Sequence, residues 1–167
     1  MPEEPRPLAV SEVMRRRLRA QPVLRLRELW NPGDPDSGAG QALGRVFEEM
    51  ARQGLTQAGT VSICTWPATE AGLIPGEAAV PVDRPGRSAG EVEALTLPAG
   101  TALSILYRDD IHLTSSEPVV DQLRTYADAQ GLALTDAPRW IYHTAPDWNL
   151  EPDDHLIEAL WPIRDEE

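Results

Sequence analysis

The chain has 167 residues with an ordinary apolar content, which suits one domain or two small halves packed together. Its formal charge of -12 argues against general binding to a nucleic-acid backbone, and its single cysteine excludes an internal disulfide and favours a cytoplasmic protein. No apolar run is long enough to span a bilayer and no export leader is present, so no membrane association is expected.

The first segment, residues 8–20, is ambiguous. Its apolar residues recur at helical spacing, whereas its place before a sheet-forming region favours a strand. The stretch MRRRLR (14–19) is interpreted as a solvated face, with a nucleic-acid or partner patch as the alternative.

The next elements follow a strand, helix, strand, strand order. Alternation in PVLRLRELW predicts a strand over 22–30, followed by a loop rich in turn residues. Ser37 is a plausible cap for a helix over 39–53, which Gly54 ends. Two strands, at 60–66 and 77–82, and a linker at 83–90 complete this half.

The second half repeats this order. Its predicted elements are strands at 91–98 and 101–108, a helix over 117–130 capped by Ser115 or Ser116, and strands at 139–144 and 155–163.

Three short echoes indicate an internal duplication. AQPVLRL begins at Ala20 and AGTALSI at Ala99, QGL ends both predicted helices, and EAAVPV and EALWPI begin at Glu77 and Glu158. The echoes keep the same order and a nearly constant offset of about 80 residues. We therefore expect a single domain over 1–167 built of two pseudo-symmetric halves, about 8–82 and 91–164.

The duplicated plan, together with LPAGTALSILYRDD, WIYHTAP, the terminal EALWPI and VMRRRLRAQPVLRLREL, resembles the GyrI-like small-molecule-binding domain. That domain is the effector-binding module of many bacterial MerR-type and AraC-type multidrug regulators. No helix-turn-helix segment precedes it here, so the chain resembles a stand-alone member. RDDIHL (108–113) replaces the family's Gly-Pro-Tyr type turn.

The resemblance implies an α+β fold of duplicated strand-helix-strand-strand (SHS2-type) halves, with antiparallel sheets and a central cleft. It also implies that Glu158 lies at the floor of that cleft, ringed by aromatic side chains, with Tyr142 on the preceding strand. A carboxylate among aromatic rings attracts an organic cation, to which each ring face adds ~0.5–2 kcal/mol.

Several residues support this interpretation independently. Five tryptophans against one phenylalanine are unusual for a core, and strand alternation places Trp140 and Tyr142 on one face. In the duplicated scheme Cys64 corresponds to Tyr142, with Trp66 two residues further on. Trp148, in the loop before the last strand, is a candidate lid. The predicted ligand-binding residues are Glu158, Tyr142, Trp140, Trp66, Trp148 and Cys64.

Structural alternatives stay open for most of these residues. Glu158 is either ligand-facing or a structural partner of an arginine such as Arg139, and a structural role is favoured for Glu77. The three histidines show no metal-ligand spacing, and no nucleotide or cofactor motif is present, so neither metal nor cofactor is expected.

Three functions remain. The first is binding of small lipophilic or cationic molecules by a sensor or sequestering protein. The second is hydrolysis of small strained electrophiles, with Glu158 as base on a water and Tyr142 assisting. The third is a protein-interaction role, as a gyrase inhibitor or as the effector partner of a regulator.

Overall fold

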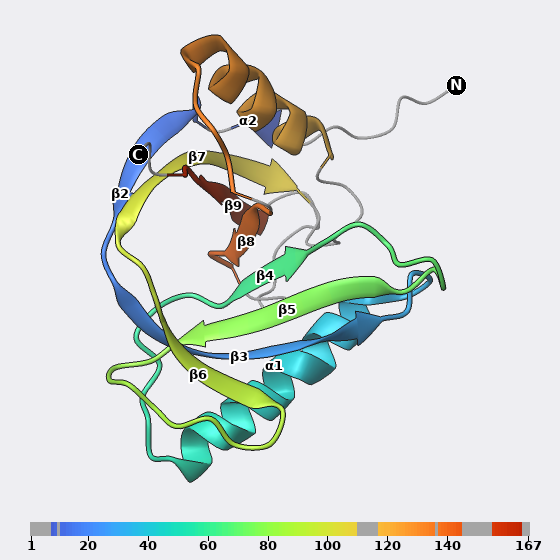
Figure 1. The fold of residues 1–167 in the computed structure, drawn as a ribbon, viewed down its shortest axis with the longest axis vertical. Helices are drawn as coiled ribbons and strands as arrows, with labels where there is room; N and C mark the ends of the chain where they lie inside the picture. The colour runs from blue at the N-terminus through green and yellow to red at the C-terminus, as the bar shows by residue number, and fades with distance from the viewer. Residues whose placement is uncertain (1–7, 10, 110–116, 136, 145–154, 165–167) are drawn as a thin grey trace. The chain divides into compact units, whose positions relative to one another are not determined.

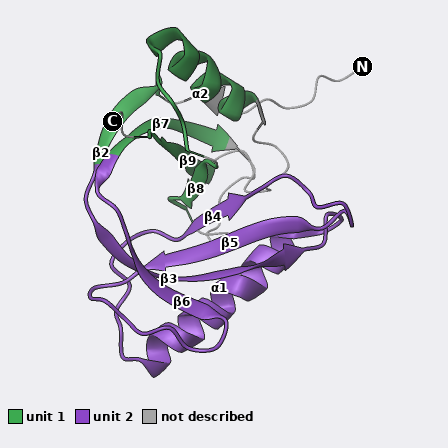
Figure 2. Ribbon diagram, in the orientation of Figure 1, with its two compact units in different colours: residues 1–17, 101–167 green, residues 18–100 purple. Residues whose placement is uncertain are grey.

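The computed structural model describes residues 8–9, 11–109, 117–135, 137–144 and 155–164. The chain divides into two compact units (Figure 2), each described by itself below. Unit 1 comprises residues 1–17 and 101–167, and unit 2 comprises residues 18–100.

Unit 2 is an antiparallel sheet with a helix along one face (Figure 1). Its elements are β3 (Gln21–Trp30), α1 (Pro35–Arg52), β4 (Ser62–Thr65), β5 (Ile74–Pro81) and β6 (Val92–Leu97). The strand order is β4-β5-β3-β6.

The start of α1 differs from the predicted one. The N-cap is Asp34, whose side chain accepts a hydrogen bond from the backbone N–H of Ser37, so Ser37 is the capped residue. Pro35 follows at the first helical position, where its missing N–H costs nothing. The predicted end is confirmed, because Gly54 adopts a φ of 67°, a left-handed conformation that suits glycine.

The packing of α1 identifies the two faces of the unit 2 sheet. Leu24, Leu26 and Trp30 alternate along β3 and are buried. A Cβ added at Gly38 of α1 or Gly76 of β5 would lie 2.6 or 2.2 Å from the Trp30 ring, so this tryptophan fills the space between helix and sheet. The other face of the sheet carries no helix of unit 2, and we call it the helix-free face of unit 2.

Unit 1 repeats the strand, helix, strand, strand series, with two short strands before it. Its elements are β1 (Leu8–Ala9), β2 (Met14–Leu18), β7 (Gly100–Asp109), α2 (Glu117–Gln130), β8 (Arg139–Tyr142) and β9 (His155–Pro162). The strand order is β1-β7-β9-β8, and β2 also pairs with β7. The described part of segment 8–20 therefore contains two strands and no helix, as its position favours.

The core of unit 1 lies between its sheet and α2. Val119, Leu123 and Ala127 of α2 pack in one buried cluster with the sheet residues Leu103, Ile105, Tyr107, Trp140, Ile157, Ala159 and Trp161. The opposite side of this sheet carries no helix in the described part of unit 1, and we call it the helix-free face of unit 1.

The predicted fold class is confirmed: the protein is α+β, and each unit contains a strand, helix, strand, strand series in an antiparallel sheet, with β6 added in unit 2 and β1 and β2 added in unit 1. The unit boundaries differ from the predicted halves, 8–82 and 91–164. β6 pairs with β3 and stays in unit 2, whereas β1 and β2 pair with β7 of unit 1. Hydrogen bonding between segments distant in sequence therefore decides the division. In the described part of the chain, neither helix combines the length and apolarity needed to cross a membrane.

Candidate functional site

Glu158 of β9 points to the helix-free face of unit 1. Its register partners are Leu106 of β7 and Ile141 of β8, and directly paired residues of antiparallel strands share a face. Its chain neighbours Ile157 and Ala159 point the other way, into the core under α2. Glu158 is 3% exposed, so its carboxylate needs partners within the protein.

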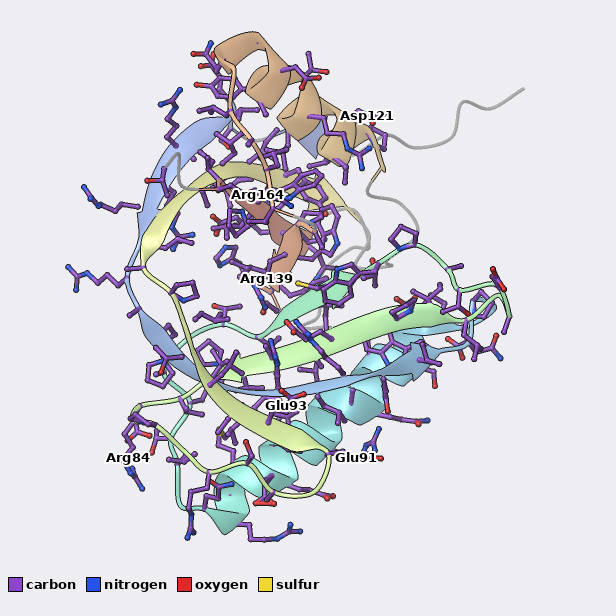
Figure 3. All side chains as sticks on the ribbon, viewed as in Figure 1. Arg84, Glu91, Glu93, Asp121, Arg139 and Arg164 are labelled. Carbon is purple, nitrogen blue, oxygen red and sulfur yellow. The ribbon has the colours of Figure 1, made fainter. Side chains whose placement is uncertain are left out.

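Three donors surround this carboxylate. Ser104 donates its hydroxyl to Oε2 at 2.5 Å, and Arg16 donates from Nη1 to the same oxygen at 2.6 Å. His143 Nε2 lies 3.0 Å from Oε1. An arginine partner agrees with the structural alternative for Glu158. Arg139 of β8, named as an example of such a partner, pairs in register with Leu160 and so lies on this face too (Figure 3).

The donors decide the charge of Glu158. Burial disfavours the charged carboxylate and by itself raises its pKa, but the hydrogen bonds from Ser104, Arg16 and His143 outweigh burial. The pKa of Glu158 therefore lies below its usual range. The positive charge of Arg16 adds to these hydrogen bonds in lowering the pKa of Glu158. Glu158 is ionised at neutral pH.

Glu77 of β5 holds the corresponding place in unit 2. It is 1% exposed and pairs in register with Arg27 of β3 and Cys64 of β4. Arg27 Nε donates to it at 2.9 Å and Arg25 Nη1 at 3.3 Å. Arg25 also reaches Glu93 of β6 at 3.2 Å (Figure 3). Glu77 is thus held within its own sheet, as the structural interpretation predicts.

Trp66 follows β4 on this same face. The guanidinium of Arg27 lies over its ring, with Cζ 5.3 Å from the centroid. A tryptophan that is predicted to bind a ligand cation therefore already has a cation of the protein over its ring.

The register also tests which residues of the two units correspond. Cys64 pairs with Glu77, whereas Ile141 pairs with Glu158, so the predicted equivalence of Cys64 with Tyr142 is wrong by one residue. Cys64 itself is buried.

The residue that corresponds to Trp66 is His143. The backbone N–H of Trp66 donates to Pro75 at 3.0 Å, and that of His143 donates to Leu156 at 3.0 Å. These two acceptors precede Glu77 and Glu158, respectively, by the same number of positions. His143 therefore brings a polar ring to the position at which unit 2 has an indole.

The structure places Trp140 and Tyr142 on the other face of the unit 1 sheet. They pair with Ala159 and Ile157, and Trp140 is buried in the core, where its ring meets Tyr107 edge-on at 6.4 Å. Tyr142 therefore does not share a face with Glu158, as assistance in hydrolysis would require, because a shift of one residue turns a side chain to the opposite face.

Some of the sequence predictions concern residues that lie outside the described part of the chain. Trp148, the predicted lid, and the capping serines Ser115 and Ser116 lie outside the described residues. Among the residues that the structure does describe, no group of three or more His, Cys, Asp or Glu side chains is arranged to hold a metal ion.

Sequence reasoning missed Arg16, Ser104 and His143 as partners of Glu158. Ser104 had a weak signal, since it is a lone polar residue in the apolar run ALSIL. No sequence signal pointed to Arg16, because it belongs to a run of exposed arginines far from Glu158 in the sequence.

Several solved structures have an architecture similar to that of this chain. The sequence matches no family profile and no curated protein. Among solved structures, it is similar to EcmrR in a DNA complex, with a TM-score of 0.76 at 17% identity over 93% of this chain. The chain spans 58% of that EcmrR chain. Against the EcmrR C-terminal domain the TM-score is 0.71 at 14% identity, over 94% of this chain and 99% of that one.

Two further structures share the fold. A hydrolase from Listeria innocua has a TM-score of 0.66 at 10% identity, over 95% of this chain and 93% of that one. SAV2435, solved bound to tetraphenylphosphonium, has a TM-score of 0.57 at 13% identity, over 92% and 94%. The likeness is one of fold: this chain shares its architecture with the EcmrR C-terminal domain and with SAV2435, in keeping with the resemblance noted in the sequence.

Proposed function

We propose that this protein binds small organic molecules on the helix-free face of unit 1, and that lipophilic cations are the favoured class. The observation that carries the proposal is Glu158, a buried carboxylate that its polar partners keep ionised and that apolar side chains flank along the sheet. Leu106 and Ile141 flank it in register, and both are partly exposed. Away from bulk water a cation gains more from a fixed carboxylate, while its apolar groups are buried against such neighbours.

The fold likeness gives independent support. SAV2435 was solved with tetraphenylphosphonium, a lipophilic cation, and it shares this architecture over most of both chains. The compound is therefore a suitable probe for this protein.

The test is a calorimetric titration of tetraphenylphosphonium into the wild type, Glu158→Gln and Glu77→Gln. Glu158→Gln removes the charge while keeping the shape, so we expect binding to weaken at least about tenfold, the factor that about 1.4 kcal/mol produces. Glu77→Gln is the matched control, because it makes the same change at the corresponding position of unit 2. Equal affinities of the wild type and Glu158→Gln would contradict the proposal.

Hydrolysis is the second candidate, and the contact between His143 and Glu158 favours it. A carboxylate at 3.0 Å from Nε2 holds the imidazole in a fixed orientation. His143, rather than Tyr142, would then take the proton from a water that attacks an electrophilic carbon. The test is turnover of styrene oxide and p-nitrophenyl acetate by the wild type and by His143→Gln. Rates equal to the uncatalysed reaction in both proteins would exclude this candidate.

A further inference from the structure

The two buried carboxylates differ in how their arginines are held. Glu77 receives Arg25 and Arg27 from β3, the strand paired with its own, so two guanidinium groups start from backbone positions next to the carboxylate. Arg27 is further held over the ring of Trp66. The Arg27 side chain is 50% exposed, but that of Arg25 is only 16% exposed, so Glu77 keeps an enclosed arginine even when Arg27 turns away.

Glu158 has a different kind of partner. Arg16 comes from β2, which pairs with β7, whereas β9 lies on the other side of β7 in the sheet order. The side chain of Arg16 is 51% exposed, whereas that of Glu158 is 4% exposed. The guanidinium therefore reaches the buried carboxylate from the solvent side, and it can return to water by rotating its own side chain alone.

We propose that Arg16 is an internal counter-ion that holds the place of the ligand's cation on Glu158, and that a lipophilic cation binds by displacing it. The inference rests on the proposed function and deepens it. Ser104 and His143 keep their hydrogen bonds to the carboxylate during the exchange. One positive charge replaces another, so the carboxylate is compensated both before and after binding.

The exchange makes Arg16 a residue that determines specificity. An ion pair with a half-exposed partner is weak, and a released guanidinium regains its hydration, so displacement is inexpensive for a cation with large apolar groups. A neutral molecule of the same shape has no charge to offer Glu158 and leaves Arg16 in place. Arg16 thus separates lipophilic cations from neutral compounds of equal size.

The experiment compares Arg16→Gln with Arg15→Gln. The first removes the competing charge from Glu158 but keeps an amide that can donate a hydrogen bond. The second removes one charge from the adjacent residue, whose side chain points to the opposite side of the strand. Tetraphenylphosphonium is the cationic probe, and triphenylphosphine oxide is the neutral probe with similar aryl groups.

We expect Arg16→Gln to bind tetraphenylphosphonium about three- to tenfold more tightly than the wild type, the range expected for losing one weak competing ion pair. Arg15→Gln should stay within about twofold of the wild type. Neither substitution should change the affinity for triphenylphosphine oxide. If Arg16→Gln binds the cation as the wild type does, or more weakly, Arg16 is not a competitor and the inference is overturned.

Two controls keep the result interpretable. In the wild type, the guanidinium protons of Arg16, followed by nuclear magnetic resonance, should exchange faster with water as tetraphenylphosphonium is added. This readout needs no substitution, and unchanged exchange at saturation would overturn the inference even if Arg16→Gln does not fold. Failure of the proposed function is seen separately, as a Glu158→Gln variant that binds tetraphenylphosphonium like the wild type.

Discussion

Glu77 and Glu158 occupy corresponding positions in the two units, each paired in register with a residue on both neighbouring strands. Both are almost fully buried. Glu77 is bound by two arginines from the adjacent strand, whereas Glu158 is bound by a serine, a histidine and one arginine from β2. We infer that the carboxylate at this position stabilises the sheet in unit 2 and is available to bind a ligand in unit 1.

The first prediction concerns Glu77. Glu77→Gln should lower the free energy of unfolding by about 2–4 kcal/mol, because it removes the buried charge that Arg25 and Arg27 share. Urea denaturation measures the change. Affinity for tetraphenylphosphonium should stay within about twofold of the wild type. A stable Glu77→Gln variant that has lost binding would assign the ligand to unit 2.

The second prediction concerns Ser104. Ser104→Ala removes a hydroxyl that donates to a buried charge, so we expect a loss of about 1.5–3 kcal/mol in the free energy of unfolding. The pKa of Glu158 should rise, because one of the hydrogen bonds that oppose the effect of burial is gone. Carboxyl chemical shifts followed through a pH titration measure the second effect. An unchanged Glu158 titration would show that Ser104 does not stabilise the charge.

The third prediction concerns pH. The pKa of Glu158 is lower in the folded protein than its ordinary value of 4.5, so the ionised form stabilises the fold. This contribution is fully present above pH 4.5 and is lost as the pH falls through the depressed pKa of the folded state. Glu158→Gln should therefore show a smaller loss of stability below pH 4.5 than the wild type. Parallel curves of unfolding free energy against pH would contradict the assignment.

The fourth prediction concerns the packing of Trp30. Gly76→Ala should destabilise unit 2 by about 1–3 kcal/mol, because the added methyl would overlap the indole ring. Gly40→Ala is the matched control: it lies in α1, and a Cβ there meets nothing within 4 Å. That change should stabilise the helix by about 0.5–1 kcal/mol. Thermal unfolding of the two variants gives opposite shifts if Trp30 is packed as described.

Much of the secondary structure could be predicted because its signals are local. The helix over 117–130 was predicted with the bounds that α2 has, and QGL follows or ends both helices, with a left-handed glycine in each. The echo between Glu77 and Glu158 identified corresponding positions on β5 and β9. The start of α1 was misplaced because Ser37 and Asp34 are both good caps, and only the helix geometry chooses between them.

The environment of Glu158 could not be predicted in the same way. Alternation along a strand relates neighbours such as Trp140 and Tyr142, but it does not relate Tyr142 to a residue on another strand. That relation depends on register, and the pairing of Tyr142 with Ile157 turned it away from Glu158. The aromatic residues therefore form part of the core under α2, while polar residues surround the carboxylate.

The sequence by itself determined the fold class, the repeated order of elements and the position of Glu158 as a charged residue in an apolar strand. These features depend on hydrophobic periodicity, turn residues and internal repeats, which are all local properties of the chain. Only the tertiary structure decided which strands belong to each unit and which side chains meet that carboxylate. Arg16, Ser104 and His143 lie far apart in sequence and come from different segments of unit 1. Their meeting depends on hydrogen-bond register between strands, which a single residue's slip would abolish.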